Sequence, residues 1–305
     1  MDAGTCVARH PEPFFLEFEP GPLGQRFCLH HAPPGPLRGL VVHVHPFAEE
    51  MNKSRRMAAL QSRALADAGF AVLQMDLLGC GDSAGDFGDA SWAQWLADVV
   101  HACRWLQHRH GEAAQGEAAL PLWLWGHRAG ALLAVQAAQQ LDTPCNFLFW
   151  QPATTGKLLL QQFLRLKAAS DLLGGQAKAV MTQLRDELAA GRSVEVAGYT
   201  LPAALCSGLA QVVLKPPALA AHNIGRVVWI ELSNQPEATL SPASTSASAE
   251  WQAVGWDVHT QVAPGPAFWQ TTEIEDAPAL LAASLDAISR NRAAKPQRAA
   301  EAQPG

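Results

Sequence analysis

The sequence is short of charge and lacks the patterns that mark membrane-spanning or nucleic-acid-binding chains. Charged residues make up 16% of the 305 residues and hydrophobic residues 49%, so a large buried core is expected and global disorder is not. The net charge of -6 comes without a basic stripe or patch, which argues against a nucleic-acid partner. No uninterrupted apolar run of about 18 residues occurs, so we expect no membrane-spanning helix.

Cysteine, histidine and acidic residues also lack the spacing of a disulfide framework or a metal site. The six cysteines include no CxxC pair, so we expect reduced thiols in a cytosolic protein. No mixed cluster has metal-ligand spacing, and we expect neither a metal nor a cofactor. Residues 1–10 lack the basic start and apolar run of a secretory signal, which predicts a cytoplasmic location. Peripheral attachment to the inner face of a membrane stays open.

Short apolar runs alternate with segments of helical spacing along most of the chain. This alternation predicts a mostly parallel sheet with helices on both faces. Strands are expected within 14–31 (one or two) and at 40–45, 70–75, 122–125, 146–150, 226–232 and 257–262. Helices are expected at 54–68, from a cap at Ser91 to about His108, and at 131–141, 158–173, 176–190 and 277–290, with a loop and short helix in 241–250.

Residues 157–222 interrupt the alternation of strands and helices. They follow the fourth core strand and hold two helical stretches and then a mixed piece, so we expect an inserted helical cap. The core domain is then residues 14–156 together with 223–290. Residues 291–305 are polar and rich in alanine, proline and glutamine, and we expect a flexible tail.

A strand, a Gly-x-X-x-Gly turn and a helix follow one another around residue 128, and this is the signature of a nucleophile elbow. Gly126 and Gly130 supply the two positions at which a Cβ would clash, and Arg128 stands where a working esterase has serine. Two further motifs agree in order: the expected oxyanion loop at 45–47 and a Gly-rich turn at 76–83. Together they predict an α/β-hydrolase fold.

On these residues the sequence resembles the type 2 exosortase A system-associated hydrolases, a branch of the α/β-hydrolase superfamily. The resemblance covers roughly residues 14–290 and is most specific between His45 and Arg56. It is carried by 45–56, 76–83, 125–133 and 265–269. It implies a bacterial locus for exopolysaccharide production and for sorting proteins with a C-terminal envelope-targeting signal, with exosortase or exopolysaccharide pathway proteins as partners. It supplies no substrate.

All three positions of a Ser–His–Asp triad hold other residues. The guanidinium of Arg128 has no lone pair with which to attack a carbonyl. The acid is expected at 233–235, which holds no carboxylate, and Glu237 is the nearest. The base is expected at 264–269, which holds no histidine. Three simultaneous losses argue against the acyl-enzyme mechanism.

Arg128 is expected to point into the cleft where the strands end beneath the cap. Together with backbone N–H groups near Phe47 and Ala129 it would hold a carboxylate or phosphate, and the apolar residues of 158–166 favour an acylated ligand. Equally open is a buried ion pair of Arg128 with Glu49 or Glu50 that fills an inactive pocket. The other residues expected at this site are His45, Asn52, Lys53, Gln151 and Trp269.

Two interpretations of the charged run from Glu49 to Arg56 stay open. One is a solvated helix N-terminus, where the two glutamates favour the helix dipole. The other is a functional network in which Glu49 activates water while Arg128 holds the anion. Two functions follow: a hydrolase or acyl-transfer relative acting on an ester or thioester, or a pseudo-hydrolase that binds or carries an anionic ligand. Trp269 either plugs the pocket or stacks on that ligand.

Overall fold

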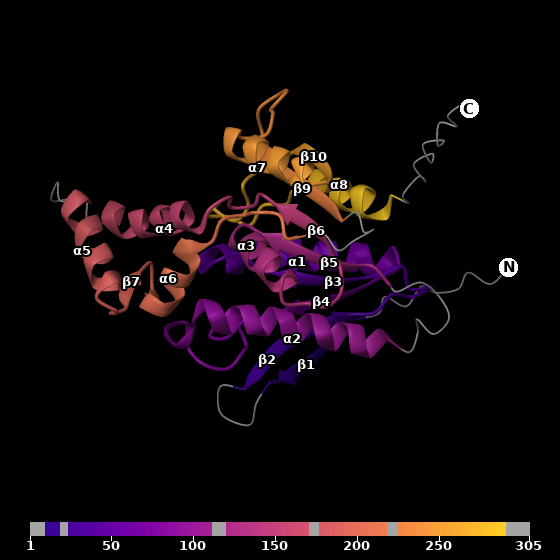
Figure 1. The fold of residues 1–305 in the computed structure, drawn as a ribbon, viewed down its shortest axis with the longest axis horizontal. Helices are drawn as coiled ribbons and strands as arrows, with labels where there is room; N and C mark the ends of the chain where they lie inside the picture. Colours follow the sequence, from indigo (N-terminus) through magenta and orange to yellow (C-terminus); the bar gives the residue numbers. More distant parts are fainter. Residues whose placement is uncertain (1–9, 19–23, 112–119, 171–176, 219–224, 291–305) are drawn as a thin grey trace, which may run out of the picture.

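The computed structural model describes residues 10–18, 24–111, 120–170, 177–218 and 225–290. Eight strands form one sheet in the order β1-β2-β4-β3-β5-β6-β9-β10 (Figure 1). Strand β2 runs antiparallel to β1 and β4, and the other neighbours are parallel, which confirms the expected mostly parallel sheet. The strands are β1 (Glu12–Glu17), β2 (Gln25–His31), β3 (Gly39–Val44), β4 (Phe70–Met75), β5 (Leu122–His127), β6 (Cys145–Trp150), β9 (Arg226–Ser233) and β10 (Asp257–Pro264).

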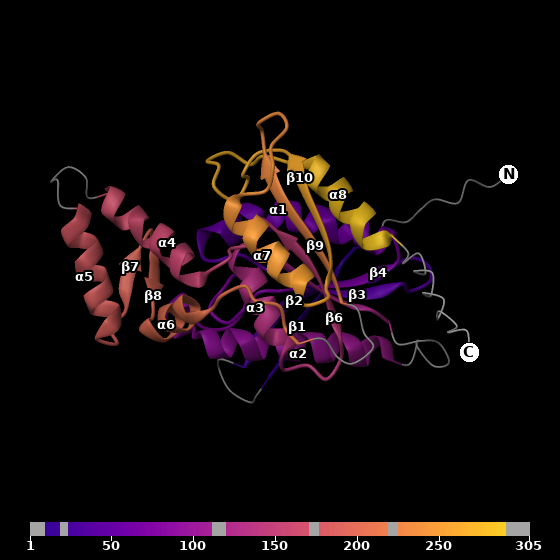
Figure 2. The same ribbon diagram turned by 45° about the horizontal axis from the view of Figure 1, so that its top comes forward.

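Helices cover both faces of this sheet (Figure 2). One face packs against α1 (Glu49–Asp67) and α8 (Pro278–Ser289). The other packs against α2 (Trp92–Gly111), α3 (Ala129–Ala138) and α7 (Pro242–Ala253). The short 3-10 helix η1 (Phe87–Asp89) precedes α2. Among the described residues no helix is long and apolar enough to cross a membrane.

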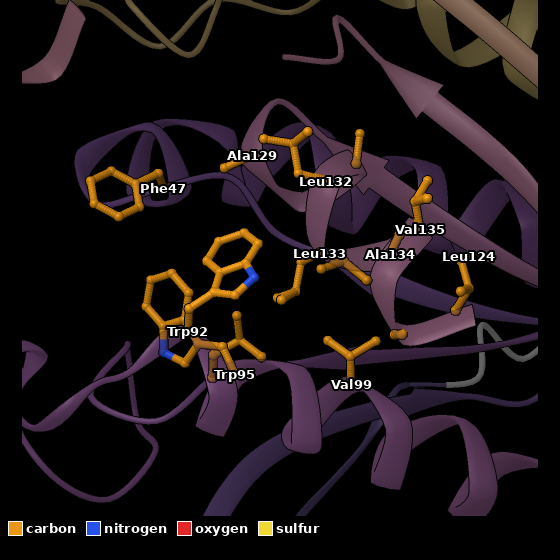
Figure 3. Packing of buried hydrophobic residues seen from close by; sticks show 14 of the residues in the cluster. Phe47, Trp92, Trp95, Val99, Leu124, Ala129, Leu132, Leu133, Ala134 and Val135 are labelled. Carbon is orange, nitrogen blue, oxygen red and sulfur yellow. The ribbon is translucent and has the colours of Figure 1, made fainter. Parts of the chain in front are cut away.

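The central strands are buried on both faces, which explains their continuous apolar runs. All six residues of β3 and of β5 are buried. Because side chains alternate along a strand, Val41 and Trp123 pack in the α1–α8 layer while Val42 and Leu124 pack in the α2–α3 layer. Trp95 meets the leucines of α3 in that second layer (Figure 3). This packing fixes the carboxyl ends of β3 and β5, from which the candidate site is built.

Between β6 and β9 lies a group of elements that we call the α4–α6 segment. In both ribbon views it stands to one side of the sheet (Figures 1 and 2). It contains α4 (Gly156–Ser170), α5 (Ala177–Ala189), the two-stranded β7 (Val194–Val196) and β8 (Tyr199–Leu201), and α6 (Ala203–Gln211). The two expected helical stretches are present, although residues 171–176 between them lie outside the described residues. So do residues 291–305, the expected tail.

Helix α1 starts at Glu49, five residues before the expected start at 54. The charged run 49–56, of which only the part from Ser54 was expected in the helix, therefore forms its first two turns. Glu49 and Glu50 occupy its first turn, where negative charge is favourable beside the unpaired backbone N–H groups. The consequence for the site is that these two adjacent glutamates point in different directions.

Candidate functional site at the elbow

The elbow adopts a sharp turn at Arg128. Its backbone lies at φ 54° and ψ -113°, between the end of β5 and the start of α3, a conformation that is strained for a residue with a side chain. A Cβ on Gly126 would come within 2.5 Å of the Cα of Ala131, and one on Gly130 within 2.0 Å of the carbonyl oxygen of Val44. Both glycines are thus required by close backbone approach, as expected from the motif.

The Arg128 side chain is held by three neighbours. Its Nε donates to Oε1 of Glu50 at 3.1 Å, and its Nη2 donates to Oε1 of Gln162 on α4 at 3.4 Å. Its guanidinium carbon lies 5.8 Å from the ring centroid of Trp269, within cation–π range. The Nη1 group makes no hydrogen bond within the described residues. Gln162 had no signal in the sequence, because only the fold brings α4 to the elbow.

The ion pair lies in a largely dry environment. The side chains of Arg128 and Glu50 are 13% and 15% exposed. Burial raises the pKa of Glu50, and the neighbouring Arg128 opposes that rise. The second carboxylate oxygen, Oε2, is buried without a hydrogen-bond partner. Burial therefore favours the neutral form of Glu50, while the contact with Arg128 favours its carboxylate.

Aromatic residues occupy the position at which a catalytic histidine would stand. The loop after β10 places Phe268 and Trp269, which are 1% and 4% exposed, against the elbow. Their ring centroids lie 5.4 and 5.3 Å from that of His127. His127 is buried, both its ring nitrogens lack partners, and burial holds its pKa well below the usual range. Trp269 thus packs against Arg128 and His127 at the place where the catalytic histidine was expected.

A carboxylate does stand near the acid position, but it performs another task. Glu231 on β9 accepts hydrogen bonds from the Ser241 backbone and hydroxyl and from the Ser244 hydroxyl, at 2.7, 2.9 and 2.6 Å. These contacts secure the start of α7. At the usual places the described residues therefore supply neither the imidazole nor the free carboxylate on which an acyl-enzyme cycle relies.

The loop after β3 and the start of α3 present backbone N–H groups without partners in the described part of the chain. The backbone N–H groups of Phe47 and Ala129 make no hydrogen bond within the described residues. Ala48 shares the strained geometry of Arg128, with φ 51° and ψ -127°. His45 is committed to the protein: Nε2 accepts from the Leu77 N–H at 3.3 Å, which leaves Nδ1 to donate to the Pro46 carbonyl at 2.8 Å. It offers no free ring nitrogen to a ligand.

Glu49 and Asn52 face away from Arg128, toward the α4–α6 segment. The hydroxyl of Tyr199 on β8 donates to Oε2 of Glu49 at 3.0 Å, and Asn52 donates to both groups. Burial and Glu49 raise the pKa of Tyr199. Gln151 bridges the ends of β6 and β9, since its Oε1 accepts from the Leu232 N–H at 2.8 Å. Lys53 is partly exposed and makes no contact with Arg128.

The other cations of the charged run have structural partners. Arg55 donates to Asp76 at 3.0 Å, and Arg56 forms two hydrogen bonds with Asp276 at 2.7 and 2.8 Å. These pairs tie α1 to the turn after β4 and to the segment before α8. Within the described residues no group of three histidine, cysteine or acidic side chains is placed to hold a metal ion.

Comparison with solved structures finds the same class of protein that the fold and the elbow indicate. A monoglyceride lipase variant of Saccharomyces cerevisiae, solved with a substrate analogue, superposes with a TM-score of 0.59 at 13% identity, covering 93% of this chain and 95% of that one. XC6422 of Xanthomonas campestris, an α/β serine hydrolase without a lid, superposes at 0.52 with 16% identity over 92% and 94%. The chain has an α/β-hydrolase fold.

The family follows from the sequence match. Residues 35–188, half of the chain, match the family described as serine aminopeptidase, S33, and the chain belongs to this family. The human protein ABHD12B is 28% identical over 149 residues, which are 44% of this chain and 38% of that protein. The match therefore spans well under half of the human relative. The serine in the family's description has no counterpart at the elbow, where Arg128 stands.

Proposed function

We propose that this chain binds a small anionic, acylated ligand at Arg128 and does not hydrolyse it. The observation that carries the proposal is the ion pair of Arg128 with Glu50 at the centre of the elbow. A nucleophile, a base and a free acid are replaced there by a cation, a tryptophan and a structural glutamate. The unpaired Nη1 of Arg128 and the free N–H groups of Phe47 and Ala129 are donors suited to a carboxylate or phosphate.

The acyl part of the ligand is supported by the apolar residues beside these donors. Phe163 on α4 packs against Phe47 with ring centroids 5.2 Å apart. Leu158 and Leu166, four residues before and after Gln162 on the same helix, are 54% and 51% exposed, so they share a helix face with it. Helix α4 also reaches Arg128 through Gln162. An anionic head at Arg128 and an acyl chain along α4 fit this arrangement.

Ligand binding is expected to depend on the protonation of Glu50. An incoming anion competes with the Glu50 carboxylate for Arg128, and burial already raises the pKa of that carboxyl. As the pH falls through this pKa, Glu50 becomes neutral and Arg128 presents an uncompensated positive charge. We therefore expect the affinity for an anion to rise on acidification and a proton to be taken up with each anion bound.

Calorimetric titration with octanoate tests the proposal, with octanol as the uncharged probe. We expect octanoate to bind more tightly at pH 5.5 than at pH 7.5. Glu50→Gln should bind it about tenfold more tightly at pH 7.5 and lose the pH dependence. Glu195→Gln, an exposed glutamate on β7, is the matched control and should behave like the wild type. Equal affinities for octanol and octanoate would contradict an anion site.

A hydrolytic alternative rests on Glu50 itself. A carboxylate of raised pKa in a cleft is suited to general-base attack by water, and Arg128 would stabilise the developing oxyanion. The same preparations separate the two functions through release of p-nitrophenol from p-nitrophenyl octanoate. Turnover that disappears in Glu50→Gln would replace the binding proposal with hydrolysis.

The biological setting that we propose is the bacterial exosortase A and exopolysaccharide system, at a cytoplasmic location. It is supported by the resemblance of residues 45–56, 76–83 and 125–133 to the hydrolases associated with that system. Pathway proteins are then the expected partners, and the ligand is an intermediate of envelope assembly. Unchanged exopolysaccharide export after deletion of the gene would speak against this setting.

A further inference from the structure

A cavity lies between α1 and the sheet, away from the elbow. Its volume is about 200 Å³, and β2, β3, β4 and α1 all contribute to its wall. The first turn of α1 separates it from Arg128, because Glu50 faces the elbow while Met51, the next residue, lines the cavity. Nothing in the proposed function uses this space.

The polar part of the cavity is an ion pair that still has hydrogen-bonding groups without partners among the described residues. Asp76 has a side chain only 9% exposed, and its Oδ2 accepts from Arg55 at 3.0 Å and from the Asp82 N–H at 3.1 Å. Within the described residues Oδ1 of Asp76 makes no hydrogen bond, nor do Nε and Nη1 of Arg55. His43 also lines the cavity, and its Nε2 is buried without a partner.

The charges select the head group of a ligand. Arg55 and Asp76 sum to zero, so a ligand with one net charge would leave one member of the pair opposed by a like charge. A molecule that carries both an ammonium and a carboxylate complements both members, with the carboxylate at Arg55 and the ammonium at Asp76. Such head groups are bound best where at least one protein charge is already fixed, and Asp76 is fixed by its two hydrogen bonds.

The remaining wall selects a compact apolar body. Phe27, Leu29 and Met51 line this part of the cavity, and Ala58 and Ala59 line it from α1. A cavity of roughly 150 Å³ lined by apolar side chains is enough to bind benzene, so this cavity has room for a body of that size and a small head. An extended chain would not fit.

We propose that the cavity beneath α1 binds a small zwitterion with a compact apolar body, an aliphatic α-amino acid being the simplest such molecule. The Arg55–Asp76 pair holds the two charges, and Met51 and the β2 residues Phe27 and Leu29 enclose the body. This site is independent of the elbow, and its ligand is of a different chemical class from an acylated anion.

Calorimetric titration of the full chain with three matched probes tests the inference. L-leucine carries both charges, isocaproate lacks the ammonium and isoamylamine lacks the carboxylate. We expect L-leucine to bind at least about tenfold more tightly than either of the other two. Arg55→Gln should weaken L-leucine by a similar factor and strengthen isoamylamine, because the ammonium at Asp76 then no longer faces a like charge. Isocaproate binding as tightly as L-leucine would overturn the role given to Asp76.

A steric block locates the site. Ala59→Leu fills the cavity from α1 and should abolish L-leucine binding, whereas Ala64→Leu, a partly buried position on the same helix that does not line the cavity, should not. Circular dichroism and thermal unfolding establish that both variants are folded. Binding of L-leucine that survives in folded Ala59→Leu, or its absence from the wild type at millimolar concentration, would refute the proposal.

Discussion

At the scale of single residues, the elbow shows how a catalytic position is reused without changing the backbone around it. Arg128 keeps the strained turn of a nucleophile, yet its side chain folds onto Glu50 instead of facing a substrate carbonyl. A buried ion pair contributes little net stability, but removing one partner is costly because the other charge remains buried alone. Arg128 and Glu50 should therefore behave as a unit.

Urea unfolding tests this coupling. We expect Arg128→Ala to lower the free energy of unfolding at pH 7.5 by about 3 kcal/mol, since Glu50 is left buried and unpaired. Adding Glu50→Gln to that variant should restore most of the loss, and acidification should narrow the difference between Arg128→Ala and the wild type, because Glu50 then becomes neutral. If the single and double variants are equally unstable at pH 7.5, the pair is not coupled.

At this scale the sequence allowed a pairing of Arg128 with Glu49 or Glu50 and had no means of choosing. Successive residues of a helix point about 100° apart, so the choice depends on where α1 begins. The helix has no side-chain cap at Ala48, and its start at Glu49 was therefore invisible. The acidic partners of Arg55 and Arg56 could not be predicted either, because these residues lie far away in the sequence.

At the scale of elements, two strand–turn–helix units stand side by side. In β3–α1 and in β5–α3, a residue with a positive φ, Ala48 or Arg128, links the strand to the helix. The units touch where Gly130 approaches the carbonyl oxygen of Val44. Close approach of the two backbones brings the free N–H groups of Phe47 and Ala129 to the same edge of the sheet.

Adding a single methyl group at Gly130 should push these two strand–turn–helix units apart. Gly130→Ala would place a Cβ 2.0 Å from a backbone oxygen, and we expect a loss of about 3 kcal/mol in the free energy of unfolding. Gly111→Ala, at the end of α2 where nothing lies within 4 Å, is the control and should be neutral. A thermal midpoint for Gly130→Ala equal to that of the wild type would show that the approach is not required.

Elements with a strong period were predictable and short ones were not. The core strands and α2, whose cap at Ser91 accepts from the Gln94 N–H at 3.1 Å, fall where the pattern placed them. Strands β7 and β8 have three residues each, too few for an alternation to be recognised. They appeared only as a mixed piece before residue 222.

At the scale of the whole molecule, five histidines of the described residues are buried, namely His30, His31, His43, His45 and His127. Burial lowers the pKa of His43 to about 3, and it also lowers the pKa values of His45 and His127. In the unfolded chain these imidazoles titrate near pH 6.5. Below that pH the unfolded state binds more protons than the folded state, so folding stability must fall as the pH drops.

Each neutral buried histidine should cost about 1.4 kcal/mol per pH unit between its unfolded and folded pKa values. We therefore expect the free energy of unfolding to decline steeply from about pH 6 toward pH 4. In His43→Gln the free energy of unfolding should fall less steeply with decreasing pH, by about 1.4 kcal/mol per pH unit. His108→Gln, at an exposed position on α2, should leave this slope unchanged. Urea titrations at several pH values measure these slopes, and identical slopes in all three proteins would exclude His43 as a source.

The whole fold was predictable because its motifs are backbone requirements. The fold is shared with solved structures at only 13–16% identity, and Gly126 and Gly130 stand where the backbone leaves no room for a Cβ. The site was less predictable because it depends on contacts across the chain, such as Gln162 with Arg128 and Tyr199 with Glu49. Such contacts leave no spacing in the sequence.

Tyr199 is the only tyrosine of the chain, and it sits where β8 meets the first turn of α1. Its ring also packs on Phe87, with centroids 5.0 Å apart. Biosynthetic fluorotyrosine would therefore place one fluorine nucleus at this junction. A single resonance would report whether the α4–α6 segment rests on the core or moves away from it, free of overlap from any other tyrosine. Tyr199 can therefore serve as an intrinsic spectroscopic probe of the contact between the α4–α6 segment and the core.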